Sequence, residues 1–247
     1  MIIFFRKIRQ NLLSEGKTGK YFKYAIGEIV LVVIGILIAV QINTWNEQHK
    51  TNHKQSLVLK ELLNSINNDL RGYENNIDPR LKRKKSGIDS LHNYIYNKKE
   101  IKDSLFINFY FMSKQDVYFG YGNGPFEALK SSGLDLIRND SLRTLINNTY
   151  TTELPKVVVL GNRYYDDTKS KIDELFYKLI GIKRNYLPNG TAYTVENLKK
   201  DDILNNEDFL LAYQLEIHKY EGYTSRLKQL RTALLGLKSA IEKELEE

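Results

Sequence analysis

Apolar residues are packed most densely between residues 24 and 45, in the stretch YAIGEIVLVVIGILIAVQINTW. Residues 29–40 contain no polar side chain. As an α-helix, the 22 residues of this stretch would be about 33 Å long, which is enough to cross the hydrocarbon core of a bilayer. Tyr24 and Trp45 flank the run, where aromatic side chains favour the membrane interfaces. The pattern predicts a transmembrane helix over residues 24–45.

Beyond this helix, apolar residues recur at spacings of three and four, which is typical of amphipathic helices. Because no Pro or Gly occurs between Val40 and Arg71, we expect the membrane helix to continue outward. Asp78-Pro79 is interpreted as a stop and restart, followed by a helix ending near Asn97 and a short helix over Ile101–Met112. The first two stripes consist of Leu59, Leu62, Leu63, Ile66, Leu70, Tyr73 and Ile77, and of Leu81, Lys84, Ile88, Leu91 and Ile95.

The second half of the chain is expected to contain two further long helices. The first is capped by Asn139 or Asp140, runs to Leu179 and is kinked at Pro155. Its segment Val157–Leu160 is also compatible with a buried strand, but no second strand-like run is available to pair with it. A turn over Leu187–Gly190 and an irregular piece to about Asn205 follow.

The last forty residues carry a heptad stripe. The stripe packs either inside the monomer or between copies, and the short loops elsewhere favour the monomer. Its members are Tyr220, Tyr223, Leu227, Leu230, Leu234, Leu237 and Ile241.

These patterns predict an all-α fold. Residues 1–23 form a basic, amphipathic N-terminus and residues 24–45 the membrane helix. Residues 46–247 form an antiparallel helical bundle with a long C-terminal helix. The main interruption is residues 118–125, YFGYGNGP, with three glycines and one proline, which predicts a loop. Pro125 suits the first turn of a following short helix and Gly133 its end.

Composition agrees with a helical protein, because the 247 residues include only 4 prolines and 15 glycines. The formal net charge of +7 is uneven along the chain: residues 1–46 carry six basic and two acidic residues, which leaves 31 basic and 28 acidic residues for the remainder. We therefore expect no nucleic-acid partner. The absence of cysteine excludes disulfides, zinc thiolate sites and cysteine nucleophiles.

All six basic residues near the apolar run lie on its N-terminal side. The positive-inside rule then places residues 1–23 in the cytoplasm and residues 46–247 outside it. A cleaved signal peptide is the rival interpretation. The long positive region and the lack of a small-residue cleavage site after Ile38 oppose it.

Within the predicted span, Gly27, Gly35 and Ala39 lie near one another on one helix face and would allow a second helix to approach closely. Glu28 lies about one turn from the cytoplasmic interface. Its carboxylate is interpreted as reaching water, as pairing with a partner helix, or as taking part in ion or proton chemistry.

Several blocks of the sequence resemble an uncharacterised family of single-span proteins from flavobacteria and related Bacteroidota. The blocks are Phe4–Arg9, Leu13–Tyr21, Tyr24–Ile29 continuing through Gln41–Asn43, and Phe126–Leu142. The resemblance implies a single-pass protein of a Gram-negative bacterial inner (cytoplasmic) membrane, with residues 46–247 in the periplasm. The family has no established activity, so it assigns no catalytic residue.

Candidate chemistry is sparse. His49 and His53 stand at i and i+4, a spacing that suits a metal ion, but no third ligand is evident and lysines lie beside them, so no metal site or cofactor is predicted. The basic run Arg80–Lys85 is interpreted as a solvated helix face rather than an acidic-partner site. No serine elbow or metalloprotease helix occurs.

The loop and short helix over Tyr118–Gly133 form the candidate interaction segment outside the membrane, with Tyr118, Tyr121 and Phe126 as its aromatic residues. Glycine-rich backbone before a helix N-terminus offers N–H donors to an anion or partner. The competing interpretation is a tight connection whose aromatic residues cap the bundle.

From the sequence we expect a non-enzymatic interaction, scaffold or sensory module, anchored in the lipid bilayer. It would work through a membrane or periplasmic protein partner or as a homo-oligomer. A periplasmic small-ligand binder using residues 118–133 is the alternative, and a hydrolase of unrecognised type is a third, weaker one.

Overall fold

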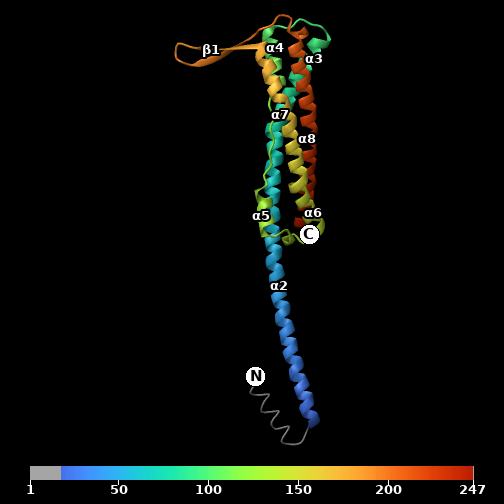
Figure 1. The fold of residues 1–247 in the computed structure, drawn as a ribbon. Helices are drawn as coiled ribbons and strands as arrows, with labels where there is room; N and C mark the ends of the chain where they lie inside the picture. The colour runs from blue at the N-terminus through green and yellow to red at the C-terminus, as the bar shows by residue number, and fades with distance from the viewer. Residues whose placement is uncertain (1–17, 247) are drawn as a thin grey trace. The chain divides into compact units, whose positions relative to one another are not determined.

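The computed structural model describes residues 18–246, so the structural statements below concern that part of the chain. Residues 1–17, within the predicted cytoplasmic segment, lie outside it. The chain divides into two compact units, Met1–Ser56 and Leu57–Glu247, which are described separately. The all-α fold is confirmed. The helices are α2 (Thr18–Gly72), α3 (Asp78–Tyr96), α4 (Asp103–Ser113), α5 (Gly124–Ser132), α6 (Asp140–Asn148), α7 (Leu154–Leu179) and α8 (Glu207–Glu246) (Figure 1).

The first unit contains the apolar segment of α2. Its mean hydropathy reaches 2.6 over 18 residues, and none of that window is buried. Ile29, Ile34 and Leu37 expose between 45% and 64% of their surface, as do their apolar neighbours. This helix is long and apolar enough to cross a membrane by length and composition.

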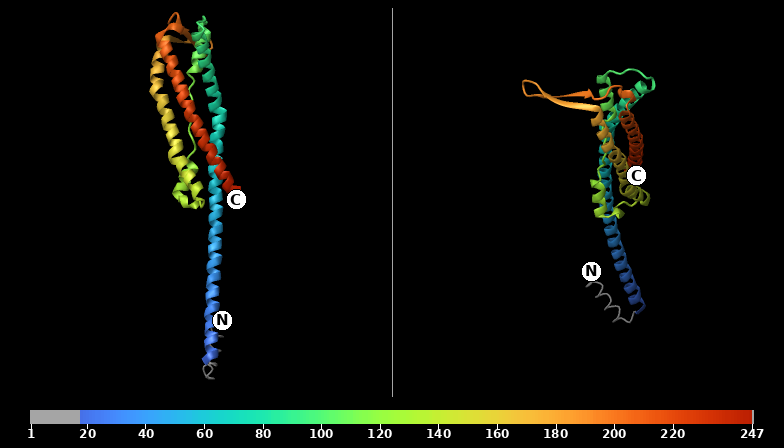
Figure 2. Two further views of the ribbon diagram at one scale, coloured as in Figure 1. Left: turned by 90° about the vertical axis from the view of Figure 1, so that its right-hand side faces the viewer. Right: turned by 45° about the horizontal axis from the view of Figure 1, so that its top comes forward.

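The second unit is built from three long helical runs that lie side by side in Figures 1 and 2. The first is the end of α2 continued by α3, the second is α6 continued by α7, and the third is α8. Helices α7 and α8 run in opposite directions because the chain reverses at the end of α7.

The heptad stripe of α8 faces the interior of this bundle. Its residues from Tyr223 to Ile241 expose at most 7% of their surface and pack against the buried face of α2 and against α6 and α7. The choice between packing inside the monomer and between copies is therefore resolved in favour of the monomer.

The expected stop and restart at Asp78-Pro79 is wrong. A π-helical turn, η1 (Tyr73–Ile77), joins α2 to α3 without a non-helical residue. A second π-turn, η3 (Thr149–Glu153), joins α6 to α7 directly before Leu154-Pro155. Both wide turns end two residues before a proline. A proline ring clashes with the carbonyl four residues earlier in a regular α-helix, and the wider turn gives it room.

The expected cap of the second long run is confirmed, since the Asn139 side chain accepts a hydrogen bond from the Leu142 N–H at 3.1 Å. Residues 157–160 are helical rather than a strand. Helix α5 has Pro125 in its first turn and ends at Gly133, whose φ of 100° lies in the left-handed region that suits glycine. The short 3-10 turn η2 (Leu134–Leu136) follows it.

The piece expected to be irregular after residue 190 instead forms a β-hairpin. Strand β1 (Ile180–Tyr186) pairs antiparallel with β2 (Ala192–Leu198), from Ile180 opposite Leu198 to Tyr186 opposite Ala192. The expected turn at Leu187–Gly190 connects the strands, and the 3-10 turn η4 (Ile203–Asn205) leads into α8. The hairpin extends away from the end of the helical bundle (Figure 1).

Two neighbouring leucines of α8 test whether the heptad stripe faces the interior of the bundle. Leu234 is fully buried, whereas Leu235 exposes 38% of its surface. We expect Leu234→Ala to lower the free energy of unfolding by about 2–5 kcal/mol, because it leaves a cavity in the core. Leu235→Ala should change it by roughly 0.5 kcal/mol or less. Denaturant unfolding of the detergent-solubilised chain, followed by circular dichroism, measures both; equal effects would contradict the burial of the stripe.

Candidate functional site

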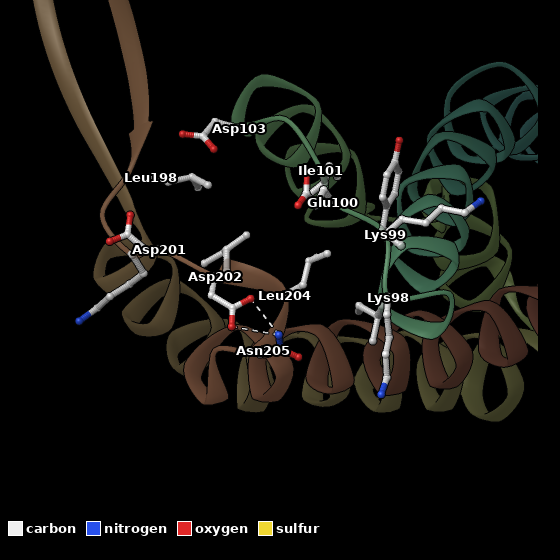
Figure 3. A pocket seen from close by; sticks show the side chains of 14 residues that line it. Lys98, Lys99, Glu100, Ile101, Asp103, Leu198, Asp201, Asp202, Leu204 and Asn205 are labelled. Carbon is white, nitrogen blue, oxygen red and sulfur yellow. Dashed lines mark hydrogen bonds between the residues drawn. The ribbon is translucent and has the colours of Figure 1, made fainter.

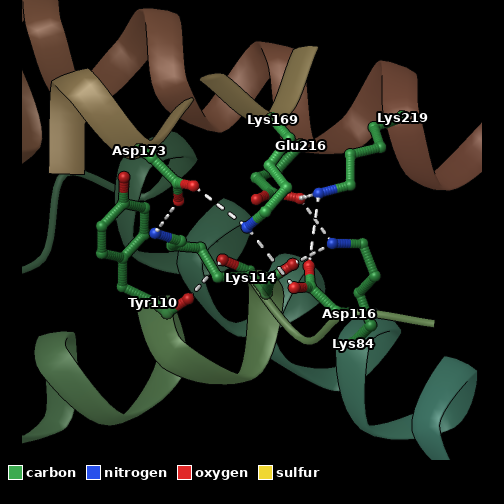
Figure 4. Close-up of polar contacts among 9 residues, drawn as sticks. Lys84, Tyr110, Lys114, Asp116, Lys169, Asp173, Glu216 and Lys219 are labelled. Atoms are coloured by element: carbon green, nitrogen blue, oxygen red, sulfur yellow. Dashed lines mark hydrogen bonds and ion pairs between the residues drawn. The ribbon is translucent and has the colours of Figure 1, made fainter. Parts of the chain in front are cut away.

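A buried ion pair lies between two apolar clusters of the second unit. The Lys84 ammonium of α3 donates hydrogen bonds to the Glu216 carboxylate of α8 and to the Ser113 carbonyl at the end of α4 (Figure 4). Lys219, one turn further along α8, lies 3.8 Å from the same carboxylate oxygen. Lys84, Glu216 and Lys219 expose 3%, 0% and 4% of their surface. These three residues form a charged layer inside the bundle.

Gly87 allows the end of α4 to pack close to this charged layer. A Cβ atom added to Gly87, one turn after Lys84, would lie 2.5 Å from the backbone nitrogen of Ser113. Only a residue without a side chain permits this approach of the two helices. The close contact places the Ser113 carbonyl where Lys84 can donate to it.

Further ion pairs extend the charged layer toward the surface. Asp116 lies between Lys219 at 3.7 Å and Lys169 at 3.5 Å. Asp173 lies between Lys169 at 3.0 Å and Lys114 at 2.8 Å. The resulting chain of contacts, here called the charge ladder, alternates in sign in the order Lys84, Glu216, Lys219, Asp116, Lys169, Asp173 and Lys114 (Figure 4).

Burial shapes the electrostatics of the ladder. Burial lowers the pKa of Lys84, while the attraction of Glu216 acts against that shift. Burial also acts to raise the pKa of Asp173, but hydrogen bonds from Lys114 and Lys169 outweigh it, so its pKa lies below the ordinary value. The pKa of Tyr110, beside the ladder, is raised by burial and then by the charges of Glu216 and Asp173. Lys114 and Lys169 thus favour the ionised form of Asp173.

Two buried oxygen atoms beside these charges lack a hydrogen-bond partner within residues 18–246, the Tyr110 hydroxyl and Oε1 of Glu216. The layer separates an apolar cluster containing Leu81 and Tyr223 from one containing Ile88 and Tyr213. Because an unpaired charge there would be costly, the ladder fixes how α3, α4, α7 and α8 align.

The candidate interaction segment is tied to the bundle by its backbone. The Gly122 N–H donates to both carboxylate oxygens of Asp69, at 3.1 and 3.0 Å, and its carbonyl accepts from the Ser65 hydroxyl. The Phe119 N–H donates to the Tyr223 hydroxyl at 3.1 Å. Residues 114–123, here called the strap, therefore run as an extended connection held by α2 and α8. These two backbone donors are already engaged within the protein.

The three aromatic residues named for this segment have different environments. Phe126 is buried and stacks on Tyr150 with the ring centroids 4.8 Å apart. Tyr121 approaches the same tyrosine at 6.3 Å, whereas Tyr118 exposes 56% of its surface. The structure thus brings Tyr121 and Phe126 together as a cap on the bundle and leaves Tyr118 at the surface.

In the predicted span, apart from the adjacent residues and the helix's own backbone, no atom of the described residues lies within 4 Å of a Cβ added at Gly27 or Gly35. Ala39 is exposed and Glu28 is partly exposed. The small-residue face is thus open along the described part of the helix.

The largest pocket described lies elsewhere, at the end of the bundle where the α3–α4 and β2–α8 connections meet (Figure 3). It holds about 570 Å³, a volume typical of small-molecule sites. Lys98 and Lys99 extend away from it, whereas Glu100 and Asp202 lie around it (Figure 3). Among residues 18–246, no three His, Cys, Asp or Glu side chains group closely enough to hold a metal ion.

Sequence reasoning missed both the ladder and this pocket. Lys84 was assigned to a solvated basic face, but it is buried while Arg80, Lys82, Arg83 and Lys85 are exposed. The sequence did contain a signal that Lys84 is buried, because Lys84 occupies a position of the apolar stripe between Leu81 and Ile88. Glu216 likewise falls between the buried Tyr213 and the Tyr220 that begins the heptad stripe. The pocket has no comparable signal, since it forms between two connections far apart in sequence.

The fold and the charge ladder define a helical-bundle protein whose N-terminal helix carries a segment able to span a membrane. A family model described as a family of unknown function (DUF6090) matches residues 28–174, more than half of the chain. The chain belongs to this family, which confirms the resemblance to a family of unknown function. The matched range reaches Glu174 on α7 and stops before the hairpin and α8. Comparisons with curated proteins and with solved structures gave no match.

The contribution of the buried Lys84–Glu216 pair to stability can be tested by substitution. Glu216→Leu should lower the free energy of unfolding by about 3–5 kcal/mol, because it leaves Lys84 buried without its anion. Lys84→Met combined with Glu216→Leu should recover part of that loss, since the Lys84 charge is then gone and Lys219 keeps Asp116 at 3.7 Å. Lys85→Met, at the exposed neighbouring position, serves as the control and should leave the unfolding midpoint unchanged. A double variant as unstable as the sum of the two single variants would contradict the pairing.

Proposed function

We propose that the protein is a membrane-anchored helical interaction module that works through protein partners or self-association rather than by catalysis. The observation that carries this proposal is the uncovered apolar segment of α2. Exposed side chains from Ile29 to Ile42 form a continuous apolar surface, which a lipid bilayer would cover. The same helix supplies the core residues Leu59, Leu62 and Ile66 to the second unit.

The proposed location is a bacterial inner membrane, with residues 1–23 in the cytoplasm and residues 46–247 in the periplasm. The charge distribution supports this orientation, because six basic residues lie within residues 6–23 before the span, whereas three, Lys50, Lys54 and Lys60, follow within fifteen residues of it.

The proposed contact surface within the membrane is the face formed by Gly27, Gly35 and Ala39, with Glu28 beside it. Small residues allow helix backbones to approach closely, and a carboxylate near the interface can pair with a polar group of a second helix. The open space at Gly27 and Gly35 supports this assignment.

A non-enzymatic role is supported by the way the buried charges are used. Lys84 and Glu216 pair with each other rather than face a cavity large enough for an organic substrate. The alternative, ligand binding at residues 118–133, has less support because the N–H groups of Phe119 and Gly122 are engaged within the protein. The hydrolase alternative has no specific observation in its favour.

The orientation is tested by single cysteines in the cysteine-free chain. Ser14→Cys should be labelled by a membrane-impermeant maleimide only after the inner membrane is opened, whereas Ser225→Cys should be labelled once the periplasm is accessible. Ser225 suits this role because it is exposed on α8. The reverse labelling pattern would place the bundle in the cytoplasm and overturn the topology.

The interaction role is tested by crosslinking in membranes, followed by purification in mild detergent. We expect a reproducible homo-oligomer or partner complex, which Gly35→Ile should weaken several-fold because it adds bulk to the proposed contact face. Ile36→Leu, at the neighbouring exposed position, is the matched control and should leave the complex intact. Recovery of monomer alone from the unmodified chain would count against the proposal.

A further inference from the structure

The β-hairpin of the second unit is a sheet of only two strands within residues 18–246. Its base is packed, because Ile180 is buried in a core cluster and Leu198 packs against the same cluster. Farther along the strands, apolar side chains expose between 43% and 66% of their surface. These residues are Ile182, Tyr186, Tyr193 and Val195. Because a two-stranded hairpin is only marginally stable in water, a further strand would stabilise this one.

The outer edge of β2 carries free backbone groups. The Lys199 N–H donates to the Leu179 carbonyl at 2.9 Å, at the base of the hairpin. Together with the strand register, this bond means that odd-numbered residues of β2 bond to β1, whereas even-numbered residues direct their backbone groups outward. The outward groups form no hydrogen bond with another residue of the range 18–246. They belong to Ala192, Thr194 and Glu196.

The two edges of the hairpin differ in charge. Strand β1 carries Lys183 and Arg184 side by side at its centre. Two copies of β1 pairing antiparallel about either residue would set like charges directly opposite each other, which is destabilising. Strand β2 carries one charge, Glu196. Pairing of two β2 strands about Thr194 sets Glu196 opposite Ala192 of the second copy, so no like charges meet.

The same register makes favourable side-chain pairs between the copies. Thr194 lies opposite Thr194 of the second copy, and Tyr193 lies opposite Val195 on each side of that centre. Pairs of threonines, and pairs of an aromatic with a β-branched residue, stabilise neighbouring strands. The pairing therefore covers two of the exposed apolar residues of the hairpin, Tyr193 and Val195.

We propose that two copies of the chain join along the outer edges of β2, antiparallel and centred on Thr194, to form a sheet of four strands. Both outer edges of this sheet are β1, where Lys183 and Arg184 oppose the addition of further strands. The assembly therefore closes as a symmetric dimer. The hairpin extends away from the helical bundle, which leaves the edge of β2 accessible to a second copy (Figures 1 and 2).

This inference rests on the proposed anchoring and self-association, and it names the surface that pairs outside the membrane segment. The contact covers residues 192–196 of each strand, which is small beside the roughly 1,200 Å² that a stable interface in solution buries. Confinement of both copies to one membrane raises their effective concentration and compensates for the small area. The pairing is therefore measured in membranes.

Disulfide crosslinking of the full-length, cysteine-free chain in membranes tests the register. Thr194→Cys should form a disulfide-linked dimer on mild oxidation, because directly opposite residues of a hydrogen-bonded antiparallel pair have Cα atoms about 5.5 Å apart, within the range of a disulfide. Asn185→Cys on β1 is the matched control and should stay monomeric, since the two β1 strands are separated by both β2 strands. No Thr194→Cys dimer, or an equal yield from Asn185→Cys, would overturn the proposal.

Proline variants test the pairing without a disulfide. Thr194→Pro removes an outward N–H and no bond inside the hairpin, so it should lower the yield of chemically crosslinked homodimer several-fold. Ile182→Pro, which removes an outward N–H from the β1 edge, is the control and should leave the yield unchanged. Circular dichroism of each variant checks that the bundle remains folded. Equal yields from Thr194→Pro and the unmodified chain would contradict pairing along β2.

The outcomes separate this inference from the proposed function. If Gly35→Ile disperses the complex whereas Thr194→Pro does not, self-association stands and the β2 edge is the wrong surface. Monomer alone from the unmodified chain removes both proposals. If Thr194→Pro releases a different protein and Thr194→Cys forms no dimer with itself, the edge binds an extended segment of that protein, and the pairing of two copies is overturned.

Discussion

The ion pair between Lys84 and Glu216 is the constraint on which the arrangement of the second unit depends. Apolar stripes of leucine and isoleucine can slide along one another by a turn at modest cost, because many registers bury similar area. A buried charge has no such freedom, since any other register would leave it without a partner. The pair therefore sets the register of α3 against α8, and the Ser113 carbonyl extends the same constraint to the end of α4. The strap begins at that point, so its position follows as well.

Most of the helical framework was predictable because it depends on local spacing. The stripe from Leu59 to Leu70, the Asn139 cap and the heptads of α8 each appear in the structure, as the periodicity of a helix requires. The charge ladder was not predictable in the same way. A lysine at a stripe position is treated as solvated unless its partner is known, and the partner of Lys84 lies 132 residues away. The end pocket depends on the same kind of long-range contact.

The errors at Asp78-Pro79 and at the hairpin also have physical causes. Proline rules describe a regular α-helix, and they overlook a preceding π-turn that relieves the clash, as at Pro79 and Pro155. The first long run consequently stays helical up to Tyr96. The alternation of apolar residues in the hairpin is short, because it covers only Ile180 and Ile182 in β1 and Tyr193 and Val195 in β2. Its pairing is set by the turn at Gly190, whose φ is 83°.

The strap limits which deletions this protein can tolerate. It begins beside Lys84 and is held again at Asp69, so it runs back along a helical stretch of fifteen residues, about 22 Å. The nine steps from Ser113 to Gly122 span at most roughly 30 Å when extended, which leaves little slack. A deletion of three residues in the strap would leave six steps, at most roughly 20 Å, which is too short unless the helix also loses a turn. A deletion of this size in the strap must therefore be matched by a deletion in the distant helical stretch.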